Sequence, residues 1–156
     1  MAKQPNSRHC FICGVENPVG LKLVFHEPQQ GVVECRFTVA DHFQSYPGVL
    51  HGGVVATILD ETCARVYLGD PASPRTVFTA KLEVKYRKHV PLGRALKVVG
   101  KALPQRGLAL ESWAGIYDES AALLAEARAM LVDGTDKASQ ADRDAIGWTL
   151  LPDDSV

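Results

Sequence analysis

A histidine, two glycines and an acid fall close together in one segment of this 156-residue chain. His51 is followed directly by Gly52 and Gly53, and Asp60 comes seven residues after Gly53. Seven residues are about two helical turns at 3.6 residues per turn, so a helix that begins here places Gly53 and Asp60 on one face. The unpaired N–H groups of a helix start favour an electron-rich oxygen, and glycine leaves room for its approach. The segment therefore indicates a candidate active site with Asp60 as its carboxylate.

The residues after the glycines predict a buried helix from Val54 to Leu68, because nearly every side of it is apolar. A carboxylate inside such a helix needs a reason, although a tight turn followed by an ordinary solvated acid is the plain alternative. The neighbouring acid, Glu61, is rotated by about 100° from Asp60 and cannot face the same cleft. We expect Glu61 to pair with a nearby base or to shape the pocket.

Alternating apolar and polar residues on both sides of this helix predict an antiparallel sheet. In the clearest of these segments, which begins at Phe78, Thr79 falls in the polar set and Tyr86 in the apolar set. The segment from Ala121 to Met130 also alternates, although its composition favours a helix. One helix covers only one sheet face, so the other face and the edges indicate a homo-oligomer. The other expected strands are Leu21 to His26, Val32 to Val39, Phe78 to His89, Arg94 to Leu103 and Leu108 to Tyr117.

The length and the net charge of the chain limit the number of domains and the kinds of partner that we expect. The length suits one domain, and a net charge of -1 gives no general attraction to nucleic acid or to an anionic membrane. No apolar run is long enough to cross a bilayer and no secretory leader is evident, so we expect a cytoplasmic protein. Basic strand residues leave a nucleic-acid or protein-interaction module as an alternative, but exposed aromatic stacking platforms are sparse.

The cysteines do not form the framework of a small secreted protein. Cys10 and Cys13 form a C-x-x-C pair, but a closed zinc site needs four ligands and no second pair follows. We therefore expect a knuckle of reduced thiols and no metal. The sequence divides into an arm carrying this knuckle at 1–20, a main domain at 21–134 and a polar tail at 135–156, which we expect to be mobile or to dock on a partner.

Two motifs resemble those of the hotdog-fold acyl-CoA thioesterases: Pro47-Gly48-Val49-Leu50-His51-Gly52-Gly53-Val54 with Asp60-Glu61, and the strand Thr79 to Tyr86 followed by Val90-Pro91-Leu92-Gly93. The chain is most similar to the phenylacetate-pathway (PaaI-like) branch, and the Cys10 to Gly14 knuckle is seen in one subgroup. The resemblance implies an α+β hotdog fold, with an antiparallel sheet wrapped around one long central helix. It also implies that Ala121 to Leu131 is an edge strand, and that a homodimer or a tetramer of two dimers carries active sites at its subunit interface.

The same resemblance implies hydrolysis of an acyl-CoA thioester to a free acid and coenzyme A. The Gly53 N–H would hold the carbonyl oxygen, while Asp60 of the partner subunit would activate water or attack directly. Thr79 would position the water. His51 would bond the loop or the thioester carbonyl, or act only as a structural cap of the helix. No cofactor is implied, since coenzyme A is part of the substrate.

Other residues are expected to bind the substrate. Ser45 stands where some relatives have asparagine, and the longer Gln44 beside it is a candidate replacement. Cationic groups after the long strand suit the phosphates of coenzyme A. A hotdog module that binds acyl-CoA without hydrolysing it remains the alternative. The expected binding residues are Gly52, Gln44, Ser45, Phe43, Tyr46, Arg87, Lys88 and His89.

Overall fold

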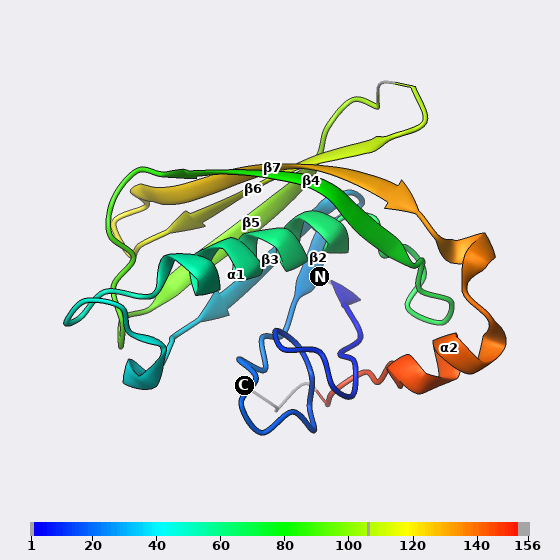
Figure 1. The fold of residues 1–156 in the computed structure, drawn as a ribbon, viewed down its shortest axis with the longest axis horizontal. Helices are drawn as coiled ribbons and strands as arrows, with labels where there is room; N and C mark the ends of the chain where they lie inside the picture. The colour runs from blue at the N-terminus through cyan, green and yellow to red at the C-terminus, as the bar shows by residue number, and fades with distance from the viewer. Residues whose placement is uncertain (1, 106, 153–156) are drawn as a thin grey trace.

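One antiparallel sheet and one long helix dominate the computed structural model, which describes residues 2–105 and 107–152. The helix α1 (Gly52–Arg65) packs against one face of the sheet (Figure 1). This arrangement confirms the predicted α+β hotdog fold. Residue 1 of the predicted arm and residues 153–156 of the predicted tail lie outside the described residues.

The sheet contains seven strands within the described residues, in the spatial order β1-β2-β3-β5-β6-β7-β4. Each neighbouring pair is antiparallel. Short helices lie before α1 and in the tail: η1 (Asp41–Phe43), η2 (Thr135–Lys137) and α2 (Gln140–Ile146). The strands are β1 (Ala2–Lys3), β2 (His26–Gln29), β3 (Val32–Phe37), β4 (Val77–Tyr86), β5 (Leu96–Ala102), β6 (Leu110–Tyr117) and β7 (Leu123–Asp133).

The order of the last strands differs from two expectations. β7 is a strand, as the resemblance implied, but it lies between β6 and β4 and is not an edge strand. The edge belongs to β4, which does not neighbour β5. The connection after β4 leaves this edge because the Leu50 N–H bonds Val90 O at 2.8 Å and the Gly93 N–H bonds Val39 O at 3.0 Å. These bonds carry the chain past the start of α1 to the β3 side of the sheet.

Small residues explain why β7 is a central strand despite its helical composition. Ala125, Ala127 and Ala129 are buried on the face toward α1, where short side chains let the helix lie close to the sheet. β7 also has a hydrogen-bonded neighbour on each side, so packing and strand pairing override a modest helix propensity.

α1 is buried on one face only within the single chain. Val55, Ile58, Leu59, Thr62 and Cys63 lie against the sheet. The opposite face is half-buried or exposed, whereas the sequence predicted a buried helix, and it carries Gly53, Ala56, Thr57 and Asp60. The predicted small-residue face is therefore open to a ligand or to another chain.

The first hairpin forms, but it is displaced along the sequence. β2 continues to Gln29, and the turn is made at Gly31, whose φ is +74°. Residues 21–25, predicted as strand, bond instead to the arm, with the Leu21 N–H on Phe11 O and the Leu23 N–H on Ile12 O, both at 2.9 Å. Residues 21–25 therefore form backbone hydrogen bonds with the arm, although the alternation of the sequence predicted that they would pair with a neighbouring strand of the sheet.

The tail packs on the arm of the same chain, where mobility or docking on a partner was expected. Asn6 and Thr149 exchange two backbone hydrogen bonds of 2.8 Å, and the Arg8 N–H bonds Ile146 O at 2.9 Å. Figure 1 accordingly shows the tail after α2 returning to the arm. Among the described residues, we find no helix with the length and apolar character needed to cross a membrane.

Candidate active site

The side chain of His51 caps the start of α1. Its Nδ1 accepts a hydrogen bond of 3.0 Å from the Gly53 N–H. The imidazole therefore covers the N–H that was predicted to hold a carbonyl oxygen. A Cβ at Gly53 would lie 3.1 Å from Nδ1, so the imidazole would have to shift by a few tenths of an ångström to make room for it. A substrate oxygen can reach this N–H only after the imidazole turns away.

Tyr86 ties the end of β4 to the helix start. Its hydroxyl donates to Gly52 O at 2.8 Å. Sequence reasoning placed Tyr86 in the apolar register and missed it as a site residue. The alternation in β4 could have identified Tyr86, because it places Tyr86 on the same side of the strand as Leu82 and Val84, which pack toward the core.

Asp60 meets Thr79 on the open side of α1. The Thr79 hydroxyl donates to Asp60 Oδ1 at 2.7 Å. The carboxylate is half-buried and keeps its second oxygen, Oδ2, outside this bond. The pair joins the central helix to the edge strand β4.

A β-bulge brings Thr79 to this position and corrects the predicted alternation. Thr79 pairs with Leu131 and Lys81 with the adjacent Met130, so Ala80 is an extra residue in β4. The bulge shifts the register by one residue. Thr79 consequently faces α1, together with Leu82 and Val84, instead of joining the polar set. Phe78 turns the other way and is 58% exposed.

A cavity of about 550 Å³ opens beside the start of α1. It gathers many of the residues that were predicted to bind the substrate. Val49, Leu50, Val55, Tyr86 and Val90 complete its walls and make them largely apolar. The predicted residues on its walls are Ser45, Tyr46, Gly52, Arg87, Lys88 and His89.

The guanidinium of Arg87 is held on the outer face of the sheet. Its Nε donates to Glu126 Oε1 at 3.1 Å, and Trp113 Nε1 donates to Glu126 Oε2 at 2.8 Å. These bonds hold the pKa of the Glu126 carboxyl below its usual range. Arg87 is thus already paired, so Lys88 and His89 are the better-placed candidates for a phosphate contact at the cavity.

The loop before α1 uses two of the predicted residues to support itself. Gln44 Oε1 accepts from the Gly48 N–H at 3.1 Å, which closes a turn where Gly48 has φ +76°. Phe43 packs edge-on against Phe11, with ring centroids 6.2 Å apart. Of the predicted residues in this loop, Ser45 and Tyr46 lie on the cavity wall, whereas Phe43 and Gln44 do not. The Gln44 side chain thus supports the turn at Gly48.

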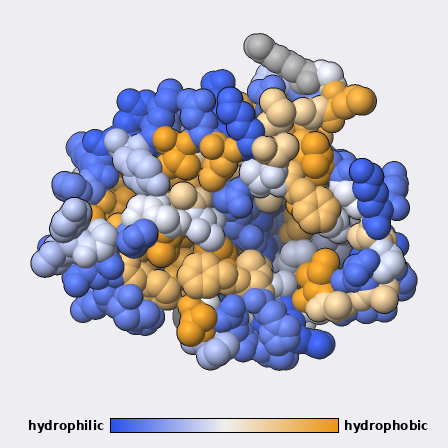
Figure 2. Space-filling view, in the orientation of Figure 1, coloured by the Kyte–Doolittle hydropathy of each residue, from blue (hydrophilic) through white to orange (hydrophobic). Residues whose placement is uncertain are grey.

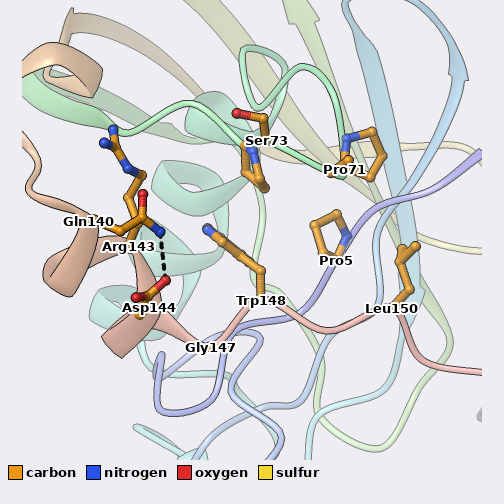
Figure 3. A pocket seen from close by; sticks show the side chains of 11 residues that line it. Pro5, Pro71, Ser73, Gln140, Arg143, Asp144, Gly147, Trp148 and Leu150 are labelled. Atoms are coloured by element: carbon orange, nitrogen blue, oxygen red, sulfur yellow. Dashed lines mark hydrogen bonds between the residues drawn. The ribbon is translucent and has the colours of Figure 1, made fainter.

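A larger cavity, of about 860 Å³, lies between the arm, the loop after α1 and the tail (Figure 3). Its walls include Pro5, Pro71, Arg143 and Trp148. On the α2 side of the cavity, Gln140 Nε2 donates to Asp144 Oδ1 at 2.7 Å (Figure 3). The cavity at the start of α1 is the smaller of the two, but it adjoins the helix start and Tyr86.

The surface around α1 is mixed in character. Figure 2, drawn in the orientation of Figure 1, shows hydrophobic residues reaching the surface on both sides of the helix, with weakly polar residues between them. Val54, Leu82 and Val84 are among the partly buried apolar residues there. The open face of α1 is thus flanked by apolar surface.

Comparison with known families gives one match over half of the chain. The sequence model of the Thioesterase superfamily matches residues 47–125. The acyl-coenzyme A thioesterase THEM4 of Rattus norvegicus is 31% identical over 91 residues, which cover 58% of this chain and 38% of that protein. The acyl-coenzyme A thioesterase THEM5 of Mus musculus is 29% identical over 72 residues, covering 46% and 27%. The chain spans less than half the length of these curated relatives.

Two solved structures share the fold. The thioesterase superfamily protein RHA08564 superposes with a TM-score of 0.72 at 25% identity, covering 80% of this chain and 63% of that one. The protein smu.793 of Streptococcus mutans, solved bound to acetyl CoA, gives a TM-score of 0.65 at 19% identity, covering 76% and 94%.

Proposed function

Because this chain belongs to the thioesterase superfamily, we propose that it hydrolyses an acyl-CoA thioester to a free acid and coenzyme A. The observation that carries the proposal is the Asp60 carboxylate on the open face of α1, with one oxygen bonded by Thr79 at 2.7 Å. Fixing one oxygen orients the other, which is what a general base or a nucleophile needs. The names of the curated relatives and the resemblance to the PaaI-like branch support the same reaction.

In the proposed reaction, Asp60 takes a proton from a water molecule as the water oxygen bonds the thioester carbon. The C–S bond then breaks, and the sulfur of coenzyme A leaves as a thiolate that takes up a proton. Direct attack by Asp60 would form an anhydride that water hydrolyses. In both routes negative charge develops on the carbonyl oxygen, and the Gly53 N–H would stabilise it once His51 has turned away.

Helix geometry supports a site built from two chains. Gly53 and Asp60 of one chain are about 10 Å apart along α1 at 1.5 Å per residue, whereas both groups must lie about 3 Å from the reacting atoms. A second copy with its α1 antiparallel would bring Asp60 of the partner subunit to Gly53. The open small-residue face and the unpaired edge of β4 suit such a contact. We propose a homodimer, or a tetramer of two dimers.

The cavity at the start of α1 would hold part of the substrate. Lys88 and His89 on its wall would contact the phosphates of coenzyme A, and Tyr46 would cover the apolar portion. Binding of acetyl CoA by the structural relative smu.793 supports this class of ligand. The acyl group that this cavity accepts is to be identified by comparing the turnover of acyl-CoAs of different chain length.

The test is a panel of short, medium, long and aryl acyl-CoAs, read by released thiol. We expect turnover of at least one substrate, and Asp60→Asn should lower kcat/KM by about 100-fold or more, in the range of general base catalysis. Asparagine keeps an oxygen for the Thr79 hydroxyl. Glu119→Gln, an exposed acid in the turn before β7, is the matched control and should retain activity. Full turnover by Asp60→Asn would refute the assigned role.

Binding and assembly measurements separate the remaining alternative. Tight binding of a nonhydrolysable acyl-CoA analogue, with no turnover across the panel, would favour a binding module over an enzyme. Light scattering during size exclusion should give the mass of a dimer or tetramer. A monomer with full activity would contradict the two-chain site.

A further inference from the structure

The arm and α1 bring together three side chains of metal-binding type. Each of Cys10, Cys13 and Glu61 offers one ligand atom, and these three atoms all lie within 4.8 Å of one another. The sequence places Glu61 51 residues after Cys10, so only the folded chain reveals the cluster. We propose that Cys10, Cys13 and Glu61 bind one zinc ion, which joins the arm to the central helix.

The spacing of the cluster suits a tetrahedral ion. Zn–S bonds of about 2.3 Å and Zn–O bonds of about 2.0 to 2.2 Å place neighbouring ligand atoms about 3.6 to 3.8 Å apart in a tetrahedron. Cys10 Sγ already lies 3.7 Å from Glu61 Oε2. Two thiolates with one carboxylate also match the ligand types that zinc takes. Only a small closure of the cluster is needed.

Backbone hydrogen bonds shape the two-cysteine turn for this role. The Ile12 N–H donates to Cys10 Sγ at 3.3 Å, and the Gly14 N–H donates to Cys10 O at 2.8 Å. A Cβ at Gly14 would lie 2.3 Å from Cys10 O, so the turn requires glycine there. The Ile12 N–H is aimed at the sulfur, and such a donor stabilises the thiolate, which is the metal-binding form.

Arg65 orients the third ligand. Its Nε donates to Glu61 Oε1 at 2.9 Å, which leaves Oε2 directed at Cys10. Such an outer contact is typical of metal-binding carboxylates, whose orientation is set by a neighbouring hydrogen bond. The Arg65 side chain is only 2% exposed, and its Nη1 also donates to Pro5 O at 3.0 Å in the arm. Arg65 therefore holds Glu61 and the arm in one arrangement.

The charges also favour a divalent cation. Two thiolates and one carboxylate carry -3, and the buried Arg65 contributes +1, which leaves -2 in a largely buried cluster. Zinc would bring this sum to zero, so the cluster could lose its protons without leaving uncompensated buried charge. The side chain of Glu61 is 22% exposed and Cys10 is half-buried, so a water molecule can supply the fourth ligand.

The proposal is tested on the full chain, purified with reduced thiols, loaded with zinc and washed with a weak chelator. Elemental analysis should find about one zinc per chain. Cys10→Ser and Cys13→Ser should reduce zinc at least tenfold, and Glu61→Gln should weaken zinc affinity at least tenfold. Cys35→Ala, which removes a buried thiol outside the cluster, is the matched control and should keep its zinc.

A second measurement covers the case in which the serine variants do not fold. Cobalt added to the metal-free, unmodified protein should produce the thiolate-to-metal charge-transfer absorption, and a strong chelator should lower the Tm of the zinc-loaded protein. Zinc below about a tenth of an ion per chain, or equal zinc in Cys10→Ser, would overturn the proposal. A Cys10–Cys13 disulfide that persists after thiol reduction would also overturn it. None of these readouts depends on thioester hydrolysis.

Discussion

The hydroxyl of Thr79 provides a direct test of how Asp60 is oriented. Thr79→Val replaces the hydroxyl with a methyl group of similar size, so the bulge at Ala80 and the strand pairing of β4 should remain. The bond of 2.7 Å to Asp60 Oδ1 is lost. We expect kcat/KM for an acyl-CoA substrate to fall, because the carboxylate then samples orientations in which it cannot assist water.

The expected size of the loss follows from the exposure of the pair. A hydrogen bond to a charged group contributes about 1.5 to 3 kcal/mol. Thr79 is exposed and Asp60 half-buried in the single chain, so water can replace part of this bond. We therefore expect about 1 to 2 kcal/mol in the transition state, which corresponds to about a 5- to 30-fold loss in kcat/KM. The free energy of unfolding should change by less than about 1 kcal/mol.

The assay is the initial rate of thiol release, measured on Thr79→Val, Thr79→Ser and Asp60→Asn. Serine keeps the hydroxyl, so Thr79→Ser should stay within about threefold of the unmodified protein. In an Asp60→Asn background, Thr79→Val should add little further loss, because the two residues act through one contact. Equal activity of Thr79→Val and the unmodified protein would refute this role. Equal loss in the serine and valine variants would instead indicate a packing effect.

Two further predictions concern the helix start and the core. Gly53→Ala adds a methyl group beside the N–H that is proposed to hold the carbonyl oxygen, so thiol-release assays should show at least a tenfold loss of kcat/KM. The Tm should stay within a few degrees, since alanine is favoured over glycine in helices by about 1 kcal/mol. Undiminished activity would contradict this prediction. Burial raises the pKa of Cys63 from 9.0 to about 11, so its protonated thiol stabilises the fold fully below pH 9 and that contribution is lost as the pH rises toward 11. Denaturant titrations should therefore show a smaller alkaline loss of stability in Cys63→Ala, by about 1.4 kcal/mol per pH unit, and parallel curves for the two proteins would be the contrary result.

Local patterns were enough to predict most elements of the fold. The helix at Gly52 and the strands at Val32, Leu96 and Leu110 follow from periodicity and from turn residues, which depend on near neighbours in the chain. The segment after Ala121 was ambiguous between helix and strand by composition, and its central position was not predictable. Strand order depends on which edge a connection reaches, and that is set by contacts between distant residues.

The candidate site shows the same division. His51, Gly53 and Asp60 belong to one helix and its cap, so their spacing alone placed them on a common element. The direction of Thr79 was not predictable, because a single extra residue at Ala80 reverses the alternation on which the prediction relied. The hydrogen bond from Arg87 to Glu126 was also not predictable, because it joins residues 39 positions apart.

The sequence by itself therefore determined the capped helix start, the face that Gly53 and Asp60 share, and the C-x-x-C turn, since each depends on residues a few positions apart. Tertiary structure decided which groups meet these elements. It brought Thr79 to Asp60 and carried Glu61 to Cys10 across 51 residues. The physical reason is that strand pairing and packing between distant segments select such contacts. The spacing of residues a few positions apart does not predict them.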